Sequence, residues 1–133
     1  MAERSLRGCR ILVVEDEYML ADELEMELGD AGAVVIGPAG TVKDALAFIG
    51  SEQHLDGAVL DVSLRGDFIF PAADLLIERG VPFVFTTGYD ASTIPVRFQQ
   101  VVRCEKPVNI KRITQALGRL IDAEVQSGGR TPC

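Results

Sequence analysis

The chain lacks any hydrophobic run long enough to cross a membrane, which needs roughly 20 consecutive apolar residues. Arginines stand near the N-terminus at Arg4, Arg7 and Arg10, but the apolar run after them spans only residues 11–14. A secretory signal requires an apolar region of roughly 7–15 residues. We therefore expect a cytoplasmic protein with no membrane partner.

Cysteine and positive charge are also scarce. The three cysteines, Cys9, Cys104 and Cys133, are odd in number and far apart, so they form neither a disulfide framework nor a metal-ligand pattern. We expect free thiols in a reducing compartment. The net charge of −7 argues against nucleic acid as a partner, because binding to phosphates needs a basic surface. The length of 133 residues suits one domain.

Short apolar runs alternate with segments of helical periodicity along the chain. Strands are expected at about 10–14, 33–36, 57–60, 82–86 and 100–104, and helices at about 18–31, 42–49, 71–79 and from 109 onward. Gly37–Gly40 should break the chain, and 61–67 should form a loop. We expect a leader over 1–9, one domain over 10–122 and a flexible tail over 123–133.

This alternation predicts an α/β fold with a doubly wound, five-stranded parallel sheet covered on both faces. Right-handed crossovers limit the topologies, and the flavodoxin-like strand order 2-1-3-4-5 is the natural choice. The segment 91–99 contains Pro95 and no apolar period, so the fourth helix should be short or disordered.

Polar side chains follow four of the expected strands. They are Glu15 and Asp16, Asp61, Thr87, and Lys106. Ligands of an open α/β sheet bind at the carboxyl ends of its strands, so these residues should share one site. Three crowded carboxylates repel one another, so either one of them takes a proton or a cation lies between them, and oxygen ligands suit Mg²⁺ or Mn²⁺.

An aspartate can accept a phosphoryl group as an acyl phosphate. Lysine and threonine side chains can bind the phosphoryl oxygens during the transfer. The set of residues at the strand ends therefore suits phosphoryl transfer to a carboxylate. Acidic residues after a strand also cap helices, and the run 15–17 alone is equally compatible with that role.

The ordered motifs resemble the receiver domain of two-component response regulators over about residues 9–122. The motifs are Ile11-Leu12-Val13-Val14-Glu15-Asp16-Glu17, Leu60-Asp61-Val62-Ser63-Leu64, Thr87-Gly88 and Lys106-Pro107. The resemblance implies that Asp61 is the phospho-acceptor, Thr87 the switch hydroxyl and Lys106 the phosphate-pairing ammonium.

The same resemblance implies a set of magnesium ligands. Asp16 and Asp61 would bind Mg²⁺ directly, Glu15 through water, and Ser63 through its backbone carbonyl. The phosphodonor would be a phosphohistidine on a histidine kinase or on a histidine phosphotransfer protein.

Residues 82–89 also resemble a subgroup nicknamed FATGUY, whose members are often single-domain regulators. Gly88 stands where most receivers carry alanine, and Arg103 where strand five usually carries an aromatic residue. Tyr89, two residues after Thr87, could shield the phosphoryl group. We therefore expect the switch to be a repacking or ordering of residues 89–99 and not an aromatic rotation.

The sequence thus predicts a single-domain response regulator that phosphorylates itself, loses the phosphate slowly and is otherwise not an enzyme. It would signal by protein binding or act as a phosphate sink, as a monomer or weak dimer. Two alternatives stay open. One is a pseudo-receiver that binds partners without phosphorylation. The other is an aspartyl-phosphate hydrolase, which would want a second carboxylate where Ser63 stands.

Overall fold

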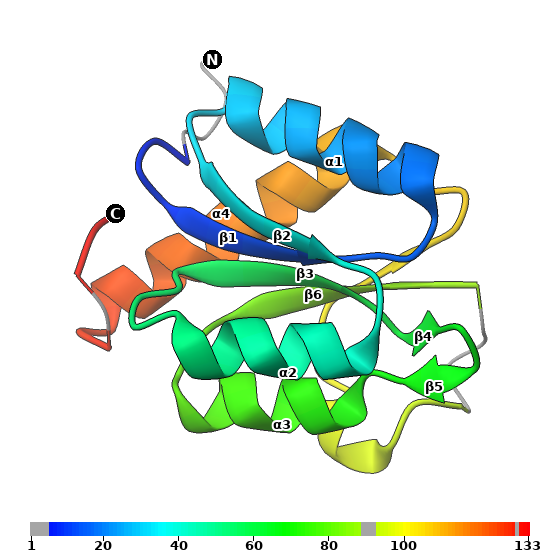
Figure 1. Cartoon of the computed structure of the whole chain (residues 1–133). Helices are drawn as coiled ribbons and strands as arrows, with labels where there is room; N and C mark the ends of the chain where they lie inside the picture. The colour runs from blue at the N-terminus through cyan, green and yellow to red at the C-terminus, as the bar shows by residue number, and fades with distance from the viewer. Residues whose placement is uncertain (1–5, 89–92, 130) are drawn as a thin grey trace.

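A five-stranded parallel sheet forms the centre of the protein in the computed structural model, which describes residues 6–88, 93–129 and 131–133. The strand order is β2-β1-β3-β6-β7, which confirms the doubly wound, flavodoxin-like prediction (Figure 1). The strands are β1 (Arg10–Val14), β2 (Val34–Ala39), β3 (Gly57–Asp61), β6 (Phe83–Thr87) and β7 (Arg103–Glu105). Their carboxyl ends therefore lie at one edge of the sheet.

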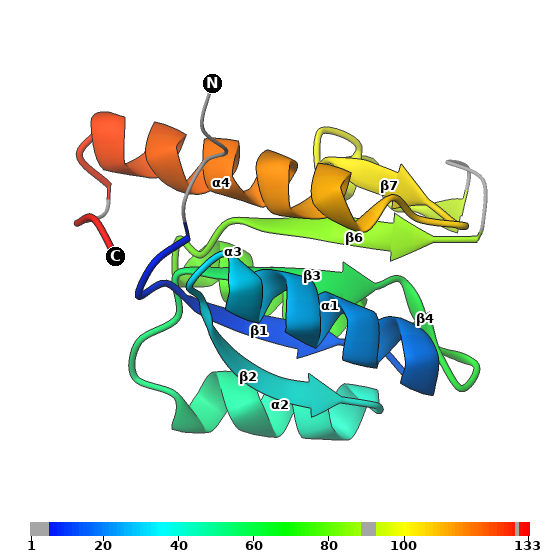
Figure 2. The same cartoon turned by 90° about the horizontal axis from the view of Figure 1, so that it is seen from above.

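Helices cover both faces of this sheet. Figure 1 shows α1 (Tyr18–Asp30) and α4 (Ile110–Gln126) on one face and α2 (Val42–Ser51) and α3 (Phe70–Glu78) on the other. Figure 2 shows the strands side by side behind α1 and α4. Because alternate strand residues point to opposite faces, Ile11 and Val13 pack with the α1/α4 core, while Leu12 and Val14 pack with the α2/α3 core. Burial on both faces explains the continuous apolar runs.

Strand β2 is longer than the sequence predicts. It was expected to end at Ile36, but it continues through Gly37 and Pro38 to Ala39, with a register shift in its pairing to β1. Gly37 has a φ of +97°, and a Cβ there would lie 2.9 Å from the Val13 carbonyl oxygen. Glycine is required at this irregularity, and Pro38 is tolerated because β2 is an edge strand.

The expected loop after β3 contains a small hairpin, β4 (Ser63–Leu64) and β5 (Asp67–Phe68). Its turn residues, Arg65 and Gly66, both have positive φ values, 51° and 87°. Such two-residue turns favour Asn-Gly or Asp-Gly, so Arg-Gly gave only a weak sequence signal.

The helix expected over 91–99 is reduced to a 3₁₀ turn, η2 (Val96–Phe98), among the described residues. This agrees with the expectation of a short helix. Phe98 is fully buried, stacks on Phe70 at a centroid distance of 5.5 Å and meets Phe85 edge-on at 5.7 Å. Arg97 forms two hydrogen bonds with Asp74 of α3, at 2.9 and 3.0 Å. The part of the expectation over 89–92 falls outside the described residues. Strand β7 begins at residue 103, later than the expected residue 100.

Two of the three cysteines are not free thiols, contrary to the expectation from the sequence. Cys9 and Cys133 form a disulfide, and Cys104 is the free cysteine of the described residues. Leu6, in the expected leader, is buried, and its N–H donates to the Ala31 carbonyl at 3.0 Å. No local pattern signals this bond, because the two cysteines stand 124 residues apart and only the fold brings them together. None of the described helices is long and apolar enough to cross a membrane.

Candidate functional site

Three carboxylates meet at the carboxyl edge of the sheet. Glu15 and Asp16 follow β1, and Asp61 ends β3, which lies beside β1 with Val14 opposite Leu60. One oxygen from each carboxylate lies within 4.8 Å of the others. Glu15 and Asp61 are buried, and Asp16 is the most exposed of the three. The parallel pairing therefore brings together residues that stand more than 40 positions apart in the chain.

Lys106 supplies the positive charge that faces this cluster. Its Nζ donates to Asp61 Oδ2 at 2.9 Å and to Glu15 Oε2 at 3.4 Å, and it lies 3.5 Å from Oε2 of the exposed Glu17. Burial alone would lower the pKa of Lys106, but the hydrogen bond and charge of Asp61, helped by Glu15, raise that pKa above its usual value. The ammonium therefore stays charged and holds Asp61 in place.

Glu15 has the most strongly perturbed pKa of the cluster. Burial is the largest cause that raises its pKa from 4.5 to about 8, and a hydrogen bond to the Asp61 side chain and the charge of Asp61 act in the same direction. The Glu17 N–H, 3.0 Å from Glu15 Oε2, and the Lys106 charge act against this rise. Glu15 Oε1 is buried and accepts no hydrogen bond. One buried oxygen of the pocket therefore has no donor, and without a cation Glu15 holds a proton at neutral pH.

A small divalent cation fits these residues. The side chains around the gap offer only carboxylate oxygens, and the orphaned Glu15 Oε1 is a ready ligand atom. Asp16 is oriented by the hairpin, since the Arg65 N–H donates to Asp16 Oδ2 at 3.0 Å. The roles of Arg65 and Glu17 at the site were not predicted. Arg65 acts through its backbone N–H, and Glu17 fits the pattern of a helix cap.

Two further residues of the expected site lie at the same edge of the sheet, Ser63 in contact with Asp61 and Thr87 at the end of the neighbouring strand β6. The Ser63 N–H donates to Asp61 Oδ1 at 3.2 Å, which fixes Ser63 next to the carboxylate. Thr87 is buried at the end of β6, and its carbonyl accepts from the Lys106 N–H at 2.9 Å. At Gly88 an added Cβ would meet nothing within 4 Å, and Tyr89 lies outside the described residues.

Arg103 lies apart from the carboxylate cluster. It is exposed on the edge strand β7, opposite Phe85 in register. It lines a surface hollow of about 590 Å³ together with Arg112 and Arg119 of α4. No carboxylate of the cluster lines this hollow, so the described geometry places Arg103 on an outer face and not at Asp61.

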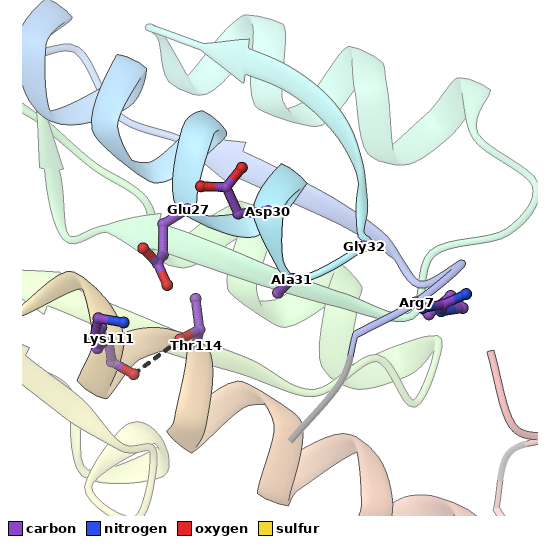
Figure 3. Close-up of a pocket in the computed structure, with 7 residues that line it drawn as sticks. All are labelled: Arg7, Glu27, Asp30, Ala31, Gly32, Lys111 and Thr114. Carbon is purple, nitrogen blue, oxygen red and sulfur yellow. Dashed lines mark hydrogen bonds between the residues drawn. The ribbon is translucent and has the colours of Figure 1, made fainter. Parts of the chain in front are cut away.

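A second hollow, of about 570 Å³, lies between α1 and α4. Figure 3 shows Glu27 of α1 facing Thr114 and Lys111 of α4, with Arg7 at the far end. The lining mixes two carboxylates with two cations, so its charge selects no single class of ligand. The carboxylate cluster at the sheet edge is therefore the stronger candidate for chemistry.

Solved structures with the same fold match this chain, whereas two sequence comparisons found nothing. No protein-family model and no curated protein matches the sequence. The solution structure of SdrG from Sphingomonas melonis Fr1 is 36% identical, covers 86% of this chain and 97% of SdrG, and has a TM-score of 0.74. A response regulator receiver protein from Sinorhizobium medicae WSM419 is 26% identical, covers 90% of this chain and 98% of its own, and has a TM-score of 0.76.

The response regulator PhyR from Brucella abortus has a similar structure but a longer chain. It is 23% identical with a TM-score of 0.76, and the match covers 91% of this chain. This chain spans 51% of that PhyR chain. The similarity to PhyR shows the fold alone, whereas the match to SdrG extends over nearly the whole of both chains.

Proposed function

Because the chain belongs to the receiver-domain family of response regulators, we propose that it is a single-domain regulator that accepts a phosphoryl group on Asp61. The observation that carries this proposal is the contact of Lys106 Nζ with Asp61 Oδ2 at 2.9 Å inside a cluster of three carboxylates. A buried carboxylate that pairs with a lysine and has two further carboxylates beside it is suited to accept a phosphoryl group.

In the proposed reaction an Asp61 oxygen attacks the phosphorus of a phosphohistidine on a histidine kinase or phosphotransfer protein. The Asp61 O–P bond forms, the N–P bond breaks, and the leaving imidazole takes a proton. Lys106 then pairs with one phosphoryl oxygen, and the Thr87 hydroxyl donates to another. The Ser63 N–H, already on Asp61 Oδ1 at 3.2 Å, holds the carboxylate as the bond forms.

We further propose that Glu15, Asp16 and Asp61 hold Mg²⁺, or Mn²⁺, with the Ser63 carbonyl as a fourth protein ligand. When bound, the cation supplies positive charge that offsets both the carboxylates and the phosphoryl oxygens. The orphaned Glu15 Oε1 and the oxygen-only donor set support this assignment.

The structure suggests how a phosphorylated site would be reported. Phe85 lies two residues before Thr87 on β6 and contacts Phe98 of η2. A displacement of Thr87 toward the phosphoryl group would therefore pull on the Phe85–Phe98 contact and repack the described part of the segment, 93–100. This route needs no rotating aromatic residue at position 103. It fits the proposed membership of the FATGUY subgroup, and we propose a cytoplasmic protein partner as the target.

The experiment is incubation of the full chain with Mg²⁺ and a small phosphodonor such as acetyl phosphate, followed by intact mass measurement. We expect one added phosphoryl group, lost in Asp61→Asn and kept in the control Asp67→Asn, which makes the same change on the exposed hairpin. Phosphate turnover without accumulation would support a hydrolase. Absence of any reaction would support a pseudo-receiver.

Hydrogen exchange tests the reporting step. On phosphorylation, we expect larger changes in exchange over 93–100 than over α4. Equal or absent changes over 93–100 would contradict the proposed repacking while leaving phosphorylation of Asp61 intact.

A further inference from the structure

The disulfide between Cys9 and Cys133 lies far from the carboxylate cluster. Cys9 directly precedes β1, so it stands at the amino ends of the parallel strands, whereas the cluster stands at their carboxyl ends. Figures 1 and 2 both show the C-terminal end of the chain beside the segment that leads into β1. The disulfide therefore ties the last residue of the chain to the start of the central sheet.

The two bonded cysteines differ in exposure. Cys9 is 3% exposed, whereas Cys133 is exposed. Both residues line a cavity of about 350 Å³ that also includes Leu6, Gly118 and Val125. Cys133 is therefore the more accessible of the two bonded cysteines for a small thiol in solution, whereas Cys9 is buried where the chain enters β1.

We propose that Cys133 is a thiol-exchange site at which a low-molecular-weight thiol, such as glutathione, opens the disulfide, with Cys9 as the resolving thiol. The thiolate of the small thiol attacks Cys133 Sγ, a mixed disulfide forms, the Cys9–Cys133 bond breaks, and Cys9 leaves as a thiolate that takes a proton. A second small thiol then releases Cys133 and forms the oxidised small-molecule disulfide. In the reverse direction, Cys9 attacks the mixed disulfide and restores the bond.

A buried carboxylate accompanies the two sulfurs. An Asp56 oxygen lies within 4.8 Å of both, and Asp56 is held by the Arg10 N–H at 2.8 Å and by His54 Nε2 at 3.0 Å. Two cysteines and a carboxylate resemble a metal-ligand set, but the disulfide uses both thiolates. The oxidised protein therefore favours exchange chemistry over metal binding at this place.

Opening the disulfide releases the tail. Residues 131–133 would lose their covalent attachment to Cys9, while Pro132 and Cys133 form part of the lining of the cavity beside α4. Since a cross-link over a long loop restricts the unfolded chain, we expect reduction to lower Tm by about 5–15 °C.

The experiment uses the full chain, purified without reductant, and its variants Cys9→Ser, Cys133→Ser and Cys104→Ser. Cys104→Ser is the matched control. Burial raises the pKa of the half-buried Cys104 thiol, the charge of Arg112 opposes this only in part, and the thiol is therefore a poor nucleophile. We expect the wild type and Cys104→Ser to have a mass two hydrogens below that of the fully reduced chain. With oxidised glutathione, Cys9→Ser should gain a stable adduct at Cys133, and Cys133→Ser should gain none at Cys9.

Peptide mapping of the wild type after treatment with graded glutathione provides a second readout that needs no variant to fold. We expect the mixed disulfide at Cys133, and its return to the Cys9–Cys133 bond when glutathione is removed. A fully reduced wild type, or an adduct on Cys9 or Cys104 in preference to Cys133, would overturn the proposal. Neither result bears on phosphorylation of Asp61.

Discussion

Replacement of Glu15 by glutamine should stabilise the metal-free protein at alkaline pH. Burial and the neighbouring Asp61 raise the pKa of Glu15 from 4.5 to about 8 in the folded state, so the folded protein binds a proton more tightly than the unfolded chain. The folded state is then favoured below the unfolded pKa, and stability falls as the pH rises through the folded pKa. The amide of glutamine stays neutral and should not show this loss.

The magnitude follows from the rise in pKa. At about 1.4 kcal/mol for each pKa unit, the rise from 4.5 to about 8 sets a ceiling of about 5 kcal/mol on the loss. Because the loss is incomplete near the folded pKa and the new amide is also buried, we expect Glu15→Gln to gain about 2–4 kcal/mol at about pH 8.5. For a chain of this length, that gain corresponds to a rise in Tm of about 6–15 °C.

The assay is thermal unfolding followed by circular dichroism in EDTA at about pH 5, 7 and 8.5, spanning the window between the two pKa values. The difference between Glu15→Gln and wild type should widen with pH. Glu17→Gln is the matched control, since Glu17 also faces Lys106 but its side chain is 62% exposed. A stability difference that is absent at the alkaline pH, or that is equal at all three values, would refute the reasoning about Glu15.

Three further predictions concern other parts of the molecule. Phe98→Ala should cost about 3–5 kcal/mol in urea unfolding, because the ring is fully buried and its removal leaves a cavity. Gly37→Ala should cost about 1–3 kcal/mol in the same assay, owing to its positive φ and the backbone contact of an added Cβ, whereas Gly40→Ala has open space and should be nearly neutral. Lys106→Met should lower the stability of the metal-free protein by about 3 kcal/mol, because it removes the ammonium that faces the buried Glu15 and Asp61 carboxylates. The same substitution should also lower the rate of phosphorylation by acetyl phosphate.

The sheet order and the place of the site could be predicted because both depend on strong local patterns. The runs before Glu15 and Asp61 are apolar at every position, and burial on both faces of a parallel sheet requires such runs. Thr41, directly before α2, is of the residue types that favour a helix N-cap, and its Oγ1 accepts from the Asp44 N–H at 3.0 Å. Local chemistry was sufficient for these features.

Features that depend on the assembled fold could not be predicted. The continuation of β2 past Gly37 depends on its pairing with β1, and the β4–β5 hairpin depends on positive φ at Arg65, which an arginine does not signal. The sequence predicts that Glu15 and Asp61 lie together, but the pKa rise of Glu15 depends mainly on its burial in the assembled site. The Cys9–Cys133 bond likewise joins residues that no local pattern relates.

The most direct test of the account is to locate the phosphoryl group on the chain. After reaction with Mg²⁺ and acetyl phosphate, reduction with borohydride converts an aspartyl phosphate to homoserine, which peptide mass spectrometry can assign to one residue. The account predicts homoserine at position 61, dependent on Mg²⁺ and on Lys106. Homoserine at Asp16 or another carboxylate, or its absence from every peptide under these conditions, would contradict it.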